Sequence, residues 1–507
     1  MMMIKKTIFK TLFALMLCPY GLMAQEQKQL LTFEDAWQLM TEQNPALLRV
    51  KEEIKQKEYE LKVKRGLHLP QVSLSAQAVS MSDPLHLDLT PVRDAITPLY
   101  NTLGNYGVFS GVPNPDPATN SMMPVLPDDM STSAVREKLL HAGGEVQNAE
   151  WDKMIQEKNF ANVSAAFVWP VFTGGKIKGA NDAANVQIEM SHENLRQTEG
   201  ALLTELVSRY YGLALGVQVS ELRKQTLEGM QNHYADAQKL FDNGMIAKVE
   251  LLHATVSRNE AKRELKKAER NIEIIRSGLA ATLASDSLNQ VIPASLLFIN
   301  KELSDLSYYV DRAQTENPQL KQLEGKKELV EIKHKVEMQE YLPSVAMMGN
   351  YNIANKDLSP YMPDWLVGVG MKWTLFDGMA RKNRIRASAT LHSQVNYAEQ
   401  KAHNDLKAYL TKLYQQLQMQ MEQKTELEST LRLAEEYLRS TEKAFSEGFA
   451  TSTSVVDAYT KVAQVKTLRL KVFYEYDVAL ASFLQTAGIP EEFARFCYGE
   501  NTLTDSY

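Results

Sequence analysis

The chain has 507 residues, of which 44% are hydrophobic and 23% are charged. This length exceeds a single globular core, so two domains or one elongated body are expected. The formal net charge of −6 excludes the basic footprint of a nucleic-acid-binding protein, so nucleic acid is not expected as a partner.

The N-terminal residues 1–24 have the pattern of a secretory signal peptide. Three lysines precede an apolar core from Thr11 to Leu17, and a cleavage site follows at Ala24. Removing three lysines and no acidic residue changes the formal charge from −6 to −9. Cys18 is not expected to carry a lipid, because the residue before it is large. Beyond this segment no run of about 18 apolar residues occurs, so no membrane-spanning helix is expected.

Short motifs recur along the chain at two fixed offsets. At an offset of 273 positions, Asn44-Pro45 returns as Asn317-Pro318 and Leu69-Pro70 returns as Leu342-Pro343. At an offset of 204, FVWPVFTGG returns as MKWTLFDGM, which pairs Trp169 with Trp373, Phe172 with Phe376 and Gly174 with Gly378. The two offsets indicate an internal duplication with 69 extra residues in the first copy, and they predict structural repeats over residues 25–290 and 291–507.

Each repeat begins with a predicted helical segment, near 33–66 and near 306–340, which ends at the Leu-Pro pair. Apolar residues then alternate with polar or small ones, which predicts strands near 71–80, 159–172, 344–354 and 365–376. Strands of about ten residues with Trp169, Trp365 and Trp373 toward their ends are typical of membrane β-strands with an aromatic belt facing outer-membrane lipid. A soluble β-sandwich is the alternative.

The extra residues of the first repeat form an insertion over about 81–155. Proline, Asn, Asp, Ser and Gly are frequent in it, which predicts irregular loop structure. Thr90 followed by Pro91 indicates a short helix within it.

Long helical hairpins are predicted after the second strand of each repeat. No proline occurs between Val171 and Ile292 or between Asp364 and Ile489, and leucines follow a coiled-coil spacing. Each stretch is interrupted once, with tips near 241–247 and 445–451, where Gly244 and Gly448 are expected to take positive φ. A first arm of roughly 65 residues would be about 100 Å long.

The segment FTGGK resembles a phosphate-binding loop only superficially. Pro170 stands where such a loop needs its first glycine, and Ile177 stands where it needs Ser or Thr. We therefore interpret Phe172, Gly174, Phe376 and Gly378 as joints between a strand and a long helix.

No catalytic, cofactor or metal site is predicted. The sequence has neither an HExxH nor a Gly-x-Ser-x-Gly motif. Cys497 would be the one cysteine of the mature chain, which excludes a disulfide framework and a cysteine zinc cluster. The protein is not expected to be an enzyme.

The order of these features, found twice, resembles the TolC-like outer-membrane efflux protein family. The resemblance implies a mainly α fold with a membrane β-barrel portion, in which a homotrimer builds a 12-stranded β-barrel and a periplasmic α-barrel. Independently, four strands cannot close a barrel, so several chains must share it. The insertion would lie outside the cell, because longer loops of such barrels are external.

The leading functional prediction is a passive outer-membrane exit duct of a tripartite efflux or type I secretion system. The partners implied are a periplasmic adaptor and an inner-membrane RND or ABC-type transporter. The alternatives are a periplasmic coiled-coil adaptor, which would not need membrane strands, and a secreted hydrolase, which lacks a catalytic constellation.

The resemblance also implies two sets of site residues. The hairpin tips, with Phe241, Gly244, Phe445 and Gly448, would dock the adaptor. Acidic residues after the second tip would ring the periplasmic aperture, and here the matching positions are Asp457 and, one turn earlier, Ser454. The first repeat has His253 in place of Asp457, so the copies differ there.

Overall fold

The computed structural model describes residues 29–285, 291–499 and 502–504. The predicted signal peptide, with Cys18, lies outside the described residues. By packing, the chain divides into two compact units, each drawn from both repeats. The helical unit comprises Met1–Leu61, Asp182–His334 and Arg386–Tyr507, and the strand unit comprises Lys62–Asn181 and Lys335–Ile385. The repeats are therefore units of sequence rather than of packing.

The duplication is visible in the helix lengths. Apart from the helices of the insertion and the short C-terminal helices, each repeat has, in order, helices of 11, 22, 67 and 36 residues. In the first repeat they are α1 (Phe33–Gln43), α2 (Pro45–Gly66), α5 (Lys176–Asp242) and α6 (Lys248–Leu283). In the second they are α7 (Leu306–Glu316), α8 (Pro318–Gln339), α9 (Ala380–Ser446) and α10 (Ser452–Ala487). At 1.5 Å per residue α5 and α9 are each about 100 Å long, in agreement with the predicted hairpin arms.

The Asn-Pro motif divides the first predicted helical segment of each repeat into two helices. Asn44 and Asn317 are extended, with ψ of 121° and 120°, because the following proline disfavours the helical conformation. Each buried asparagine amide also donates to the end of another helix. Asn44 Nδ2 donates to the Thr282 carbonyl of α6 at 2.9 Å, and Asn317 Nδ2 donates to the Thr486 carbonyl of α10 at 2.8 Å. The motif thus joins α6 to α2 and α10 to α8.

The core of the helical unit is an aromatic cluster between its helices. It includes Phe33, Tyr210, Tyr211, Phe298 and Phe493, with ring centroids 5.2–6.1 Å apart. Two small sheets close this core. They are the parallel pair β1 (Gln29–Leu31) and β6 (Val291–Pro293), and the antiparallel pair β7 (Phe298–Asn300) and β10 (Thr502–Thr504). The short η2 (Pro490–Glu492) and α11 (Phe493–Cys497) complete the unit.

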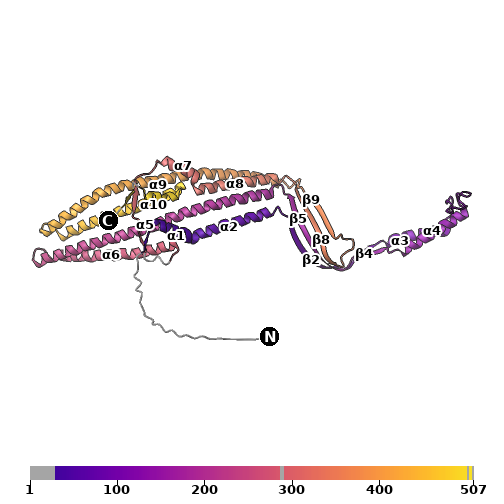
Figure 1. Ribbon diagram of the computed structural model, residues 1–507, viewed down its shortest axis with the longest axis horizontal. Helices are drawn as coiled ribbons and strands as arrows, with labels where there is room; N and C mark the ends of the chain where they lie inside the picture. Colours follow the sequence, from indigo (N-terminus) through magenta and orange to yellow (C-terminus); the bar gives the residue numbers. More distant parts are fainter. Residues whose placement is uncertain (1–28, 286–290, 500–501, 505–507) are drawn as a thin grey trace, which may run out of the picture. The chain divides into compact units, whose positions relative to one another are not determined.

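The strand unit is built on one antiparallel sheet with the order β2-β5-β8-β9 (Figure 1). Its strands are β2 (Gln71–Ser80), β5 (Asn159–Phe172), β8 (Ser344–Lys356) and β9 (Trp365–Lys372). The alternating sequence patterns therefore form strands, but β9 ends four residues before the predicted 376. Its partner strand β8 begins at Ser344, which pairs with Lys372. Residues after Lys372 therefore have no partner strand in this sheet, and β9 ends there.

The insertion is mainly helical, which corrects the prediction of loop structure. It contains a two-stranded ribbon, β3 (Leu85–Asp88) with β4 (Asp152–Gln156), and a helical hairpin of α3 (Thr90–Tyr106) and α4 (Asp128–Asn148). The short helix expected at Thr90 is real but has 17 residues, with Pro91 in its first turn. Six of the eight prolines between 81 and 130 lie outside the helices, which is why the composition resembled a loop.

Candidate functional site

The hairpin tips are glycine turns of the predicted kind. Gly244 has φ of 72° and Gly448 has φ of 79°, which confirms the predicted left-handed conformation. In both tips the amide of the next residue, Met245 or Phe449, donates to the carbonyl five residues before it at 2.8 Å. This bond belongs to the Schellman motif, which satisfies carbonyls at the end of a helix. In the second tip, the Thr451 side chain accepts from the Ser454 amide and caps α10.

The two tips pack against each other within one chain. Phe445 is only 3% exposed, and its ring lies 4.7 Å from that of His233. His233 Nε2 lies 2.8 Å from Ser452 Oγ, and Glu250 accepts from the Ser452 amide at 2.7 Å. Burial lowers the pKa of His233, which favours the neutral ring. Phe445 therefore holds the two hairpins together and does not present its ring to a partner.

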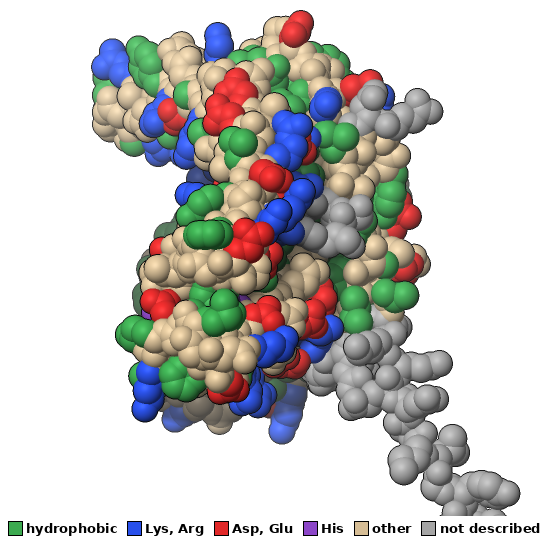
Figure 2. All heavy atoms as spheres, turned by 90° about the vertical axis from the view of Figure 1, so that its left-hand side faces the viewer, with side chains coloured by type: hydrophobic (Ala, Val, Ile, Leu, Met, Phe, Trp, Pro, Cys, Tyr) green, Lys and Arg blue, Asp and Glu red, His purple; other side chains and the backbone are tan. Residues whose placement is uncertain are grey.

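Other apolar side chains are exposed at the tips. Phe449 is 84% exposed, Val249 65% and Met245 60%, whereas Phe241 is half-buried. Figure 2 looks onto this end of the molecule, where apolar side chains lie among basic and acidic ones. These residues were not predicted from the sequence, although Met245 and Phe449 each directly follow a tip glycine.

The predicted aperture residues lie in the first two turns of α10. Asp457 is exposed, whereas Ser454 is half-buried and its hydroxyl lies 3.0 Å from that of Thr451. Ser454 therefore takes part in the helix cap. His253, at the corresponding place in α6, is half-buried.

The glycine-containing segments do join strands to helices. β5 ends at Phe172 and α5 begins at Lys176, with φ of 60° at Gly174. β9 ends at Lys372 and α9 begins at Ala380, with φ of 66° at Gly378. Phe172 and Phe376 are both exposed. The interpretation of FTGGK as a structural joint is confirmed by these bounds.

Glu340, at the end of α8, links the two joints. Its carboxylate lies 3.0 Å from Lys176 Nζ and 2.5 Å from Arg384 Nη2. The hydrogen bond from Lys176, supported by Arg384, lowers the pKa of Glu340. The lysine that suggested a phosphate loop therefore pairs with a carboxylate.

Tryptophans mark both ends of the sheet. Trp169 Nε1 donates to the His68 carbonyl at 2.9 Å, and Trp373 Nε1 donates to the Tyr341 carbonyl at the same distance. Both bonds anchor an exposed indole near a strand–helix joint. Trp365, 66% exposed, lies at the opposite end of β9. Exposed tryptophans therefore lie toward both ends of these strands.

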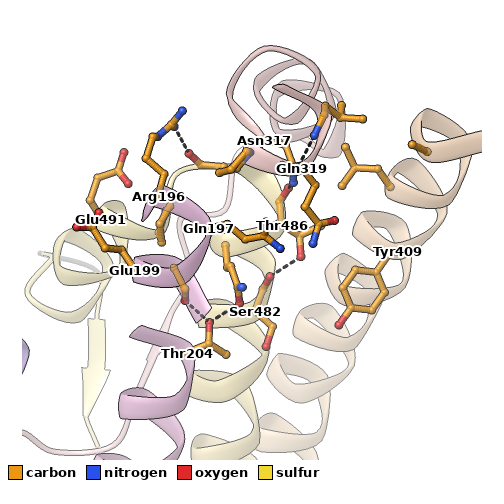
Figure 3. A pocket seen from close by; sticks show the side chains of 18 of the residues that line it. Arg196, Gln197, Glu199, Thr204, Asn317, Gln319, Tyr409, Ser482, Thr486 and Glu491 are labelled. Atoms are coloured by element: carbon orange, nitrogen blue, oxygen red, sulfur yellow. Dashed lines mark hydrogen bonds between the residues drawn. The ribbon is translucent and has the colours of Figure 1, made fainter. Parts of the chain in front are cut away.

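A cavity of about 730 Å³ lies where α10 meets α8. Its lining comes from α5, α9, the start of α8 and the end of α10, as Figure 3 shows. Much of the polar lining is already hydrogen-bonded within itself: Thr204 Oγ1 donates to Gln485 at 2.7 Å, and Arg196 donates to the Glu316 and Gly488 carbonyls. The cavity is thus part of the joint between the helices.

The described residues contain neither a metal cluster nor a membrane-spanning helix. No group of three or more His, Cys, Asp or Glu side chains in this part of the chain could hold a metal ion. No helix among the described residues is both long and apolar enough to cross a bilayer.

The fold and these sites define a class: chains built from two copies of a strand pair and a long helical hairpin. The model of the outer membrane efflux protein family matches residues 140–285 and 309–488. The chain therefore belongs to the outer membrane efflux protein family and is an outer-membrane protein. This confirms the resemblance in the sequence and argues against the periplasmic adaptor and the secreted hydrolase.

Solved structures of low sequence identity share the fold. The Campylobacter jejuni CmeC outer membrane channel is 12% identical, with a TM-score of 0.66, covering 92% of this chain and 89% of that chain. The outer membrane protein VceC from Vibrio cholerae is 12% identical, with a TM-score of 0.64, covering 90% of this chain and 96% of that chain. No curated protein matches the chain in sequence.

Proposed function

We propose that three copies of this chain form a passive exit duct for small molecules or polypeptides across the outer membrane. The observation that carries the proposal is the four-stranded sheet, in which β2 and β9 are edge strands and all ten residues of β2 are exposed. In lipid an open edge would leave backbone groups unpaired. Three such sheets would close a 12-stranded barrel, and the long helices would form the periplasmic tunnel.

A second feature supports assembly with further copies. In the helical unit α6 packs directly against α10, and both α6 and α9 also carry an exposed face. The exposed face of α6 carries, in order from the tip, Val249, Leu252, Val256, Glu260, Arg263, Lys266, Lys267, Arg270 and Ile274, with Arg263 paired to Glu260 at 2.8 Å. The exposed face of α9 carries, in the same direction, Tyr437, Leu433, Glu426, Glu422 and Met419.

These two faces are complementary. The Glu250 carboxylate accepts a hydrogen bond from the Ser452 amide, so the two tips lie at the same level. Residues of α6 and α9 that are equally far from their own tips therefore lie at the same height along the helices. Basic residues of α6 would then face Glu426 and Glu422 of the next copy, with apolar pairs on either side. We call this the α6–α9 seam.

The proposal is tested by purifying the full chain in detergent. We expect a trimer by native mass spectrometry, and we expect it to conduct ions in a planar bilayer. A folded, monodisperse monomer without conductance would contradict the proposal.

The proposed partners are a periplasmic adaptor and an inner-membrane RND or ABC-type transporter, which supplies the energy. We place adaptor docking at the exposed tip residues, with Gly244 and Gly448 shaping the turns. Phe449→Ser should lower export at least several-fold in cells, because it removes the most exposed apolar side chain of the tips. Gly448→Val should do the same by straining a residue with φ of 79°.

Trimer yield serves as the control for both tip variants and should not change. Ser446→Ala, at an exposed position just before the turn, should behave as wild type. Unchanged export in Phe449→Ser cells would withdraw the docking role of the tips.

We also place Asp457 at the periplasmic aperture. A threefold axis would bring three of its carboxylates together and attract cations to the mouth. Asp457→Asn should therefore lower cation selectivity and weaken block by divalent cations in single-channel recordings. Ser454 carries no charge, so Ser454→Ala should leave both properties unchanged. Unaltered selectivity in Asp457→Asn channels would show that Asp457 does not line the aperture.

A further inference from the structure

The helical hairpin of the insertion has an apolar stripe that is largely exposed in the described part of the chain, with only Ile96 half-buried. On α3 the residues Val92, Ile96, Leu99, Leu103 and Tyr106 follow one another at intervals of 4, 3, 4 and 3. This is the spacing of a coiled-coil seam. Tyr106 is 79% exposed, Leu99 59%, Val92 44% and Leu103 38%. We call these five residues the α3 stripe.

The packing between α3 and α4 uses a different face of α3. Gly104 lies against Leu140, where an added Cβ would come within 2.7 Å of the leucine side chain, and Tyr100 lies against Gly143. At 100° per residue, this face and the α3 stripe are roughly a third of a turn apart. The α3 stripe therefore remains open after the hairpin has formed.

The hairpin itself buries little apolar surface. In its helices only Gly104, Ser131 and Gly143 are buried. Two helices held by such small contacts gain little from the hydrophobic effect, so a further packing partner would add most of their stability. Exposed heptads of this kind are normally buried by another helix.

The charge pattern favours a copy of the same stripe as that partner. In a rotationally symmetric assembly each residue near the axis meets its own equivalent, so any charge there would be repelled. Residues 95–115 include no Asp, Glu, Lys or Arg. The uncharged segment covers the α3 stripe from Ile96 to Tyr106.

We propose that the α3 stripes of three copies pack together as a parallel helical bundle that ties the insertions to one another. This inference rests on the proposed trimer, which would hold the three hairpins at a high effective concentration and so permit a seam of only two heptads. The insertion is then an assembly element of the trimer, distinct from the sheet and from the α6–α9 seam.

Disulfide trapping in the full-length chain tests the proposal. Leu103→Cys places a thiol on the α3 stripe, and Asn105→Cys places one at the same level on the opposite side of α3, where the residue is also exposed. With copper-phenanthroline as oxidant, we expect linked dimers from Leu103→Cys within purified trimers and almost none from Asn105→Cys. The wild-type chain is the control for Cys497, which is buried.

A charge on the stripe provides a second measurement. Leu99→Asp should make the insertion at least several-fold more sensitive to limited proteolysis without changing trimer yield, whereas Asn105→Asp should not. Trimers in which Leu103→Cys forms no disulfide-linked dimers would overturn the inference. This result would not contradict the proposed duct, and it would indicate that the α3 stripe contacts lipid or another protein. A monomeric protein would remove both proposals.

Discussion

Replacing Asp477 with asparagine is expected to stabilise the helical unit at pH 7 and above, and to flatten the dependence of its unfolding midpoint on pH. Asp477 is fully buried in α10, and neither of its carboxyl oxygens has a hydrogen-bond partner of good geometry among the described residues. Burial raises the pKa of Asp477 well above its usual range, although the Phe298 backbone amide opposes this. Burial therefore favours the protonated form of this group in the folded protein.

The sign of the effect follows from linkage. In the unfolded chain an aspartate loses its proton near pH 4. Above that pH, and up to the raised pKa of the folded state, the folded chain binds one proton more than the unfolded chain, so stability falls as pH rises. Protonating a carboxyl group of ordinary pKa at pH 7 costs about 4 kcal/mol. Asp477→Asn removes this cost, so about 4 kcal/mol is the largest increase expected in the free energy of unfolding at pH 7.

The neighbouring groups do not obscure this titration. Burial raises the pKa of the Cys497 thiol to about 11, and it raises the pKa values of Tyr211 and Tyr476 as well. Between pH 5 and 8 all three keep their protons in both the folded and the unfolded chain. Asp477 is thus the member of this cluster that controls the pH dependence in that range.

Thermal unfolding followed by circular dichroism between pH 5 and 8 measures the effect. The matched control is Glu273→Gln, because Glu273 is the residue of α6 that corresponds to Asp477 at the offset of 204 and is exposed. Its unfolding midpoint should follow that of the wild type. If Asp477→Asn and the wild type lost stability in parallel as pH rises, the protonated state of Asp477 would be disproved.

Local features of the sequence predicted the local structure well. Alternation of apolar residues located the four strands of the main sheet, because one face of each strand is mostly apolar. The tip glycines were found because a left-handed residue is needed wherever a helix reverses in so short a turn. The α4 helix was missed, although residues 128–148 contain no proline, because the proline-rich segment before it dominated the interpretation.

Features that depend on tertiary packing could not be found in this way. Phe445 was assigned to docking because it begins the tip segment FSEG, which the family resemblance marks for docking, but its ring is buried against His233 of the other hairpin, more than 200 positions away. Asp477 lies in the apolar run YDVALASFL. A single acidic residue within such a run indicates a buried carboxyl group, but its burial was not predicted. The Asn-Pro pairs marked the repeats, yet their bonds to Thr282 and Thr486 join helices distant in sequence.

Replacing Arg381 with isoleucine is expected to destabilise the strand unit by about 1–3 kcal/mol, because it removes a buried guanidinium group and leaves two carbonyl groups and the Asp377 carboxylate without their donor. Arg381 is 4% exposed and joins the start of α9 to its surroundings. Its guanidinium group donates to Asp377 at 3.1 Å, to the Glu340 carbonyl at 3.1 Å and to the Thr374 carbonyl at 2.6 Å, and it lies 4.7 Å from the Tyr341 ring. Arg384→Met is the control: Arg384 also pairs with Glu340 but is half exposed, so its loss should destabilise the strand unit much less than the loss of Arg381.

The first repeat shows how the joint can be built without this charge. At the offset of 204, Arg381 corresponds to Ile177 and Asp377 to Thr173, whose hydroxyl accepts from the Ile177 amide at 3.3 Å. The double variant Arg381→Ile with Asp377→Thr copies that arrangement and leaves no unpaired carboxylate at the joint. We expect it to recover at least half of the stability lost in Arg381→Ile, measured as the midpoint of thermal unfolding in detergent. A double variant as unstable as the single one would contradict this, and would assign the cost to the Glu340 and Thr374 carbonyls that lose their donors.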